Sequence, residues 1–223
     1  MARPANPDAA RRLLDAARHV FARDGFDHAR IQDIAAEAGF SKAAFYLYFE
    51  SKEKVFERLM AELFEAVSLS NNERHSAFQG LVQRVGRCVE GDFRSGSERL
   101  TAFTALDHEY NRKALEVLWD HRDVFACVMD ASGERRLVAD RFIELSRATL
   151  VERLDEVVRA GFLRPDLDPE ICAELMIGAW LQLARRMTRL AEPPDFDHWT
   201  TQIDRFTSEG LGCMPGIPVA RET

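Results

Sequence analysis

The stretch RIQDIAAEAGFSKAAFYLYFESKEKVF, residues 30–56, decides how the N-terminal region folds. Apolar residues recur on one face over 31–38, which predicts a short helix. Gly39 follows, and glycine ends helices in the left-handed conformation without a steric penalty. Ser41 can then cap a second helix over 42–49. Two helices joined by a short turn that contains glycine form a helix-turn-helix, a DNA-binding motif.

The second helix of this motif carries the informative side chains. Phe45 and Phe49 are four residues apart and are expected to face inward. Small residues on the outer face let the backbone approach base edges, while lysine and tyrosine side chains can reach phosphates. The residues expected on the outer face and at the ends are Lys42, Ala43, Ala44, Tyr46 and Tyr48.

A run of residues at fixed offsets extends this pattern. They are Asp33-Ile34-Ala35, Ala38-Gly39-Phe40-Ser41, Phe45-Tyr46, Tyr48-Phe49 and Ser51-Lys52-Glu53. In these positions the chain resembles the DNA-binding domain of the TetR (tetracycline-repressor) family of bacterial transcription regulators, over about residues 8–64. The resemblance implies a homodimeric repressor that binds a double-stranded DNA operator and is released from it by a small-molecule effector.

The resemblance also assigns roles to individual residues. Tyr46, Tyr48 and Lys52 are expected to hold phosphates, and Gln32 is expected to meet bases together with the small residues of the second helix. The expected DNA-binding set is Arg30, Gln32, Ser41, Lys42, Ala43, Ala44, Tyr46, Tyr48 and Lys52. Arg30 departs from the family, which usually has threonine there. Arginine cannot cap a helix through an oxygen, but it can pair with a phosphate.

The charge distribution agrees with a DNA-binding N-terminal region. The 223 residues carry a net charge of −7, which argues against general coating of nucleic acids. Residues 1–56 nevertheless hold 9 basic against 8 acidic residues, whereas 57–223 hold 21 against 29. The first region can therefore approach phosphates while the second stays clear, although ordinary solvated faces would produce a similar asymmetry.

The remaining composition indicates a cytoplasmic protein without a membrane span or a disulfide framework. The four cysteines, Cys88, Cys127, Cys172 and Cys213, are far apart and are expected to be free thiols. No apolar run approaches the ~18 residues of a membrane span, and the N-terminus lacks the apolar segment of a signal peptide.

The rest of the chain is expected to be all-helical. Asn6-Pro7 predicts the cap and first residue of an initial helix that ends at Gly25, and Ser51 predicts the cap of a helix over 52–67. The polar run 70–76 is interpreted as a connection. Further helices are expected over 77–90, 97–109, 112–130, 134–160, 169–190 and 196–210. We expect two domains, a DNA-binding domain over 1–50 and an effector-binding and dimerisation domain over 51–223.

The family resemblance implies an effector pocket inside the helical body. Large aromatic and methionine side chains recur there at helical spacing and indicate an apolar or aromatic effector, although most such residues are core residues in helical proteins. The expected ligand-binding residues are Phe103, His108, Trp119, Phe125, Met129, Phe142, Met176 and Trp180.

The helices over 134–160 and 169–190 are the expected dimer surface. The resemblance implies that such a pair from each subunit forms a four-helix bundle. Gly178 and Ala179, next to large apolar residues, would allow close approach of a partner helix. Packing within one chain is the alternative explanation of the same pattern.

Two alternatives from other classes remain at this stage. The first is an all-helical enzyme, but His108-Glu109 begins an H-E-x-x-H zinc motif that Arg112 leaves incomplete. Glycine-rich phosphate loops and nucleophile elbows are absent as well, so we expect no catalytic residues, no metal and no cofactor. The second is a DNA-binding factor without effector control, which a fully packed body would favour.

Overall fold

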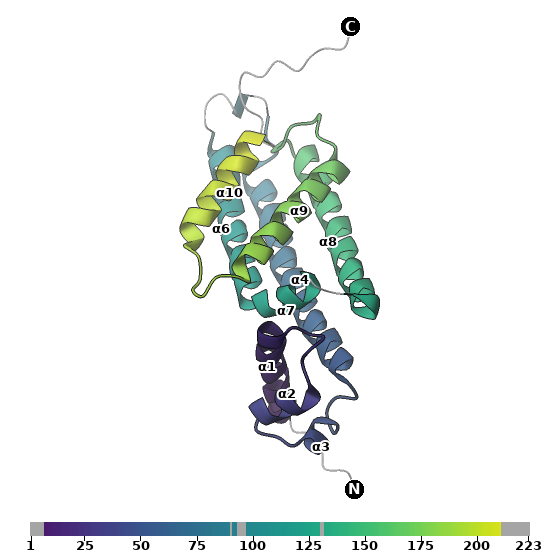
Figure 1. The fold of residues 1–223 in the computed structure, drawn as a ribbon. Coiled ribbons are helices and arrows are strands. Elements are labelled where there is room, and N and C mark those ends of the chain that lie inside the picture. Colours follow the sequence, from purple (N-terminus) through teal and green to yellow (C-terminus); the bar gives the residue numbers. More distant parts are fainter. Residues whose placement is uncertain (1–6, 90, 93–96, 130–131, 211–223) are drawn as a thin grey trace. The chain divides into compact units, whose positions relative to one another are not determined.

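The computed structural model describes residues 7–89, 91–92, 97–129 and 132–210. Every regular element in these ranges is a helix, which confirms the all-α prediction (Figure 1). The helices are α1 (Pro7–Asp24), α2 (Ile31–Glu37), α3 (Lys42–Phe45), α4 (Lys52–Val85), α6 (Glu98–Asp120), α7 (Arg122–Met129), α8 (Gly133–Arg159), α9 (Pro169–Met187) and α10 (Phe196–Gly210). The expected cap at Asn6 lies outside the described residues.

The chain divides into two compact units, and four helices contribute to both of them. Unit 1 consists of Met1–Ala66, Leu118–Ile143 and Gln182–Leu190, and unit 2 of Val67–Val117, Glu144–Leu181 and Ala191–Thr223. The helices α4, α6, α8 and α9 each run from residues of one unit into residues of the other. Unit 1 contains α1, α2 and α3, the helices of the predicted DNA-binding domain.

Apolar and aromatic side chains fill the core of unit 1. Phe21 and Phe56 both contact the ring of Phe26, with ring centroids 5.0 and 5.7 Å apart. Each buried phenylalanine contributes about 1.5–3 kcal/mol through burial alone. The helix α1 packs on α2 and also on α7, where Val124 and Phe125 are buried. The N-terminal helices therefore share their core with residues from much later in the sequence.

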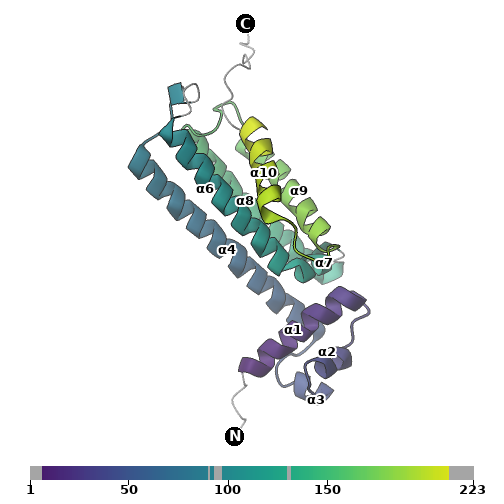
Figure 2. The same ribbon diagram turned by 90° about the vertical axis from the view of Figure 1, so that its left-hand side faces the viewer.

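Three phenylalanine rings form the centre of unit 2. The ring of Phe103 on α6 stacks on that of Phe162 at 4.8 Å, and Phe78 on α4 meets both rings edge-on. Leu81 and Cys88 are buried in the same cluster. The helix α10 lies alongside α6 in both views of the ribbon and is joined to it by polar side chains (Figures 1 and 2).

Two predicted boundaries in the body are wrong. Residues 70–76 are not a connection but part of α4, which is continuous over 34 residues. The predicted helices over 97–109 and 112–130 are instead α6, which runs through their junction, and the short α7. The run 70–76 contains neither proline nor glycine, and tertiary contacts stabilise it as helix: Arg74 pairs with Asp107, and His75 lies 3.1 Å from a carboxylate oxygen of Glu156.

Gly161 provides a test of packing in unit 2. Its φ is +83°, and a Cβ atom there would lie 2.3 Å from the carbonyl oxygen of Cys88. We expect Gly161→Ala to lower the free energy of unfolding by at least about 2 kcal/mol, through backbone strain and the clash. Gly80→Ala is the control, since Gly80 lies in a helix with no atom near its missing Cβ; it should raise stability by about 0.5–1 kcal/mol. Urea unfolding compares the two, and an unchanged midpoint for Gly161→Ala would contradict the packing.

Candidate nucleic-acid interface

The turn between α2 and α3 has the geometry that its sequence predicts. Gly39 adopts a φ of +74° directly after Ala38, the C-cap residue of α2. Arg12 on α1 donates a hydrogen bond of 2.7 Å to the carbonyl oxygen of Ala38, and its guanidinium lies 4.8 Å from the ring centroid of Phe40. The end of α2 is therefore held by a cation as well as by glycine, which is favourable at a helix C-terminus.

The second helix of the motif is shorter than predicted. Ser41 caps it as expected, because its hydroxyl oxygen accepts a hydrogen bond of 3.1 Å from the amide of Ala44. The α-helix ends at Phe45 rather than Phe49, and residues 46–49 continue as a tight turn. The amide of Tyr48 donates to the carbonyl of Phe45 at 2.9 Å, a three-residue spacing typical of tightened helix ends.

The predicted DNA-binding residues surround this short helix and differ in exposure. Phe45 is fully buried and Phe49 is half-buried, so the inward face is as expected. Arg30 occupies the cap position of α2 in an extended conformation without a side-chain capping hydrogen bond. The exposed members are Arg30, Gln32, Ser41, Lys42, Ala43 and Tyr46, and the half-buried ones are Ala44, Tyr48 and Lys52.

Leu47 belongs to the same surface and is absent from the sequence-based set. Its side chain is 78% exposed in the turn that follows α3, next to Tyr46 at 48%. A large apolar side chain there can contact thymine methyl groups or sugars. The inward spacing of Phe45 and Phe49 could have revealed it, because position 47 lies opposite both.

Lys52 occupies an unexpected environment at the start of α4. Its ammonium nitrogen lies 2.9 Å from the carbonyl oxygen of Phe26 and 3.2 Å from those of Asp27 and Ala29. It also lies 4.6 Å from the ring centroid of Phe26. An ammonium has three N–H donors, so all three are occupied within the protein. The phosphate contact expected of Lys52 remains a prediction, and the observed contacts give this residue a second role.

The eight predicted ligand-binding residues divide equally between the two units. Phe125 is buried in the core of unit 1 and Phe142 packs edge-on against Phe64 in the same unit, with centroids 6.2 Å apart. Phe103 and His108 line a half-open groove of about 420 Å³ between α6 and α10. Unit 1 contains Trp119, Phe125, Met129 and Phe142, and unit 2 contains Phe103, His108, Met176 and Trp180.

A polar network that the sequence did not reveal lies beside this groove. Asn111 is 3% exposed and donates to Asp204 on α10 at 2.9 Å, while Asp204 also lies 2.6 Å from a ring nitrogen of His108. Arg74 pairs with Asp107 and contacts Asn111 at 3.4 Å. These residues are up to 130 positions apart in the chain, so no local pattern predicts their convergence.

The fold and this surface are those of a helix-turn-helix regulator, and known proteins show which family the chain resembles. Residues 13–59 match the family model for bacterial regulatory proteins of the tetR family. The HTH-type transcriptional regulator YdgC of Bacillus subtilis is 28% identical over 178 residues, covering 77% of this chain and 76% of that protein. Over residues 13–59 the chain therefore matches the N-terminal region of TetR-family regulators, and over most of its length it is similar to an HTH-type transcriptional regulator.

Two further relatives agree with this assignment. A fatty acid metabolism regulator protein of Bacillus subtilis is 25% identical over 158 residues, covering 66% of this chain and 79% of the relative. The structure of the fatty acid degradation regulator FadR from Bacillus halodurans has a TM-score of 0.66 over 93% of this chain and 98% of its own, at 17% identity, and supports the fold. Members of the family bind DNA operators as dimers and respond to small-molecule effectors. Among the described residues, no helix is long and apolar enough to cross a membrane.

Lys52→Met separates a phosphate contact from a structural one. Loss of a phosphate contact would lower the slope of log K against log salt by about one unit. The Lys52 ammonium donates to three carbonyl oxygens, and methionine cannot replace these hydrogen bonds. We therefore expect Lys52→Met to have a lower melting temperature and weaker DNA binding, with the salt slope unchanged. Lys54→Met removes an exposed charge two residues away and should change neither stability nor affinity by more than twofold. A reduced slope at unchanged melting temperature would instead support the phosphate contact.

Proposed function

We propose that this protein is a homodimeric repressor that a small amphipathic acid releases from its operator. Residues 1–50 would be the DNA-binding domain and residues 51–223 the effector-binding and dimerisation domain. The observation that carries the DNA-binding part is the capped helix α3, which leaves Lys42, Ala43 and Tyr46 exposed on one surface. A fully buried Phe45 on the opposite face anchors that helix to the core.

Sequence would be read by α3 in the major groove. Lys42, Ala43, Ala44 and Gln32 would face the bases, and tyrosines would hold phosphates. The turn residue Leu47 would add an apolar contact. A dimer reads two half-sites on one face of DNA when its two α3 helices are about 34–36 Å apart, or a multiple of that distance.

The dimer surface is proposed on α9. Ile171 and Leu175 are 58% and 69% exposed, and Gly178 follows one helical turn later with no atom near its missing Cβ. These three residues lie at positions i, i+4 and i+7, so they share one face of the helix. Because no described atom lies within 4 Å of the missing Cβ of Gly178, packing among the described residues does not explain the small residue there, whereas close approach of a partner helix would.

Gly178→Arg tests this surface. Within one chain the position is open, so the substitution should leave the fold intact. In a dimer it would bury an unpaired charge against apolar residues, which is strongly unfavourable. We expect sedimentation to show monomers and operator affinity to fall by more than tenfold. Gly80→Arg is the matched control in another open helical position, and a Gly178→Arg protein that stays dimeric would place the interface elsewhere.

We infer an acidic group on the effector from the environment of Arg153 on α8. This residue is half-buried, and it makes no hydrogen bond or ion pair with any other residue that the structure describes. Burial lowers the pKa of its guanidinium from the usual value, and the nearby charge of Arg74 adds to the shift, while the carboxylates of Glu156 and Glu152 partly oppose it. A partly desolvated cation favours an anionic partner. The relative named as a fatty acid metabolism regulator supports a long apolar chain behind that acid, in agreement with the predicted apolar effector.

Dodecanoate and dodecan-1-ol test the effector class. Arg153→Gln should weaken dodecanoate binding by about tenfold, the loss of one charge-assisted hydrogen bond, and leave the alcohol unaffected. Arg141→Gln, an exposed position on the same helix, is the control. Operator DNA and dodecanoate should also weaken each other by the same factor, as linkage requires. Equal dodecanoate affinity with and without operator would contradict the switch and favour a DNA-binding factor without effector control.

A further inference from the structure

Arg135, near the start of α8, is a buried cation in unit 1. Arg135 is 7% exposed, and its guanidinium carbon lies 4.1 Å from the ring centroid of Phe26. One terminal nitrogen donates to a carboxylate oxygen of Asp27 at 2.8 Å and to the hydroxyl of Ser132 at 3.3 Å. A buried guanidinium is costly unless it is paired, so the attraction to Asp27 and to the ring is what makes this position tolerable.

The segment that Arg135 contacts is the loop between α1 and α2. Phe26 is 6% exposed and packs against Phe21 and Phe56. The ammonium of Lys52 contacts the same ring. It also donates hydrogen bonds to three carbonyl oxygens of this loop, which occupies all three of its N–H groups. Two cations from helices far apart in the sequence therefore hold the side chain and the backbone of one short loop.

This loop determines where α2 begins. Arg30 provides no side-chain cap, so the usual device for fixing the start of a helix is missing. The backbone closes through a hydrogen bond of 3.1 Å from the amide of Ala29 to the carbonyl of Gly25. The attachment of residues 26–29 to the two cations therefore adds to the packing of α1 on α2 in fixing the direction of α2, and of α3 after it.

We propose that Arg135 is a positioning residue for operator binding. Through its contacts with the Phe26 ring and the Asp27 carboxylate, Arg135 fixes the loop that precedes α2. In this way it orients the exposed surface of α3. At 7% exposure it has little surface with which to reach a phosphate, so it acts through the loop and not on DNA. The proposal rests on the proposed function, because it assigns a role within DNA binding.

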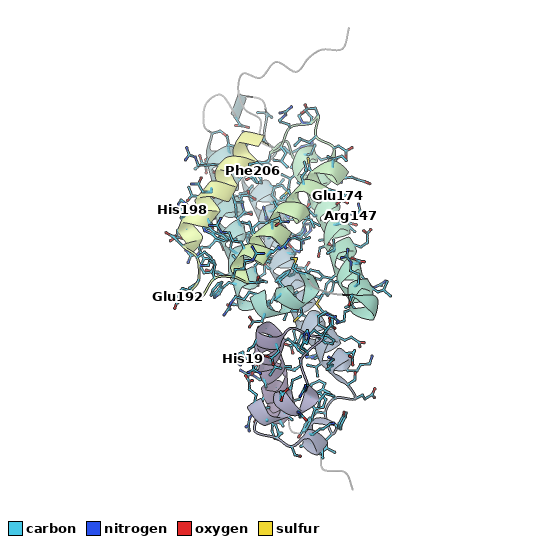
Figure 3. All side chains as sticks on the ribbon, viewed as in Figure 1. His19, Arg147, Glu174, Glu192, His198 and Phe206 are labelled. Atoms are coloured by element: carbon cyan, nitrogen blue, oxygen red, sulfur yellow. The ribbon has the colours of Figure 1, made fainter. Side chains whose placement is uncertain are left out.

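The helix that carries Arg135, α8, also contributes residues to unit 2. The same helix supplies Glu144–Arg159 to unit 2, where Arg147 lies 3.7 Å from Glu174 on α9 (Figure 3). Arg135 therefore belongs to a continuous helix whose other half lies in the unit proposed to bind the effector. A change in α8 would reach the DNA-binding loop through one side chain.

The test compares Arg135→Met with Arg136→Met. Arg136 is the adjacent residue of the same helix, is exposed and pairs with Asp140 at 2.8 Å, so its substitution removes the same charge without touching the loop. The operator is first selected from a random DNA pool with the wild-type protein. Binding is then measured well below the melting temperature, at several salt concentrations.

Arg135→Met should weaken operator binding by about tenfold, with non-specific binding and the salt slope unchanged, whereas Arg136→Met should bind like the wild type. Arg135→Lys should recover part of the affinity, since lysine keeps the charge over the ring. A purely structural role would lower the melting temperature but leave the affinity of the folded protein intact, which would overturn the proposal.

If Arg135→Met does not fold, Asp27→Asn tests the positioning role of Arg135 from the other side of the contact. The Asp27 side chain is 69% exposed, so its substitution should leave the fold intact. It should weaken operator binding, and combination with Arg135→Lys should cost less than the two single changes together, because both remove the same contact. Wild-type operator affinity in Asp27→Asn would overturn the proposal. Failure of the wild type to enrich any sequence would instead contradict the proposed function.

Discussion

The aromatic ring of Phe26 is the point on which the N-terminal helices depend. It joins α1 to α4 through Phe21 and Phe56, and it carries two cations from Lys52 and Arg135. Apolar burial supplies most of the stabilisation, but it is not directional. The cations add direction, because they bind carbonyls and a carboxylate of the same loop at hydrogen-bond distance. The N-terminal helices gain a more closely defined geometry in this way.

Unit 2 combines an apolar centre with a polar edge. The stacked rings of Phe103 and Phe162 fill its core, while Asn111 and Asp204 join α6 to α10. A buried amide such as that of Asn111 would be unfavourable without partners. Here its carbonyl and its amide group are both bonded, so the network specifies how the two helices pair without a net loss.

These contacts bear on the proposed function, in which the DNA-binding surface responds to an effector bound by the rest of the chain. Most residues proposed to read DNA lie on or beside the short helix α3, which Phe45 anchors to the core. Long helices, α4 and α8, contribute side chains to that region and to unit 2 alike. The groove beside His108 and the half-buried Arg153 belong to unit 2. In the proposed function, α8 would connect effector binding to the loop before α2, because it carries both Arg153 and Arg135.

The sequence by itself determined the helices and their ends where the signal is local. The Ser41 hydroxyl accepts a hydrogen bond from the amide three residues further on, and Gly39 adopts the left-handed conformation directly after α2, so each could be predicted from a short window. The family resemblance rests on the same window. The tertiary structure alone decided that the polar run containing Arg74 is helical and that Arg135 meets Asp27, 108 positions away. Partners at such separations are chosen by packing of the whole chain, and the strength of a cation's contacts depends on burial, which no local pattern encodes.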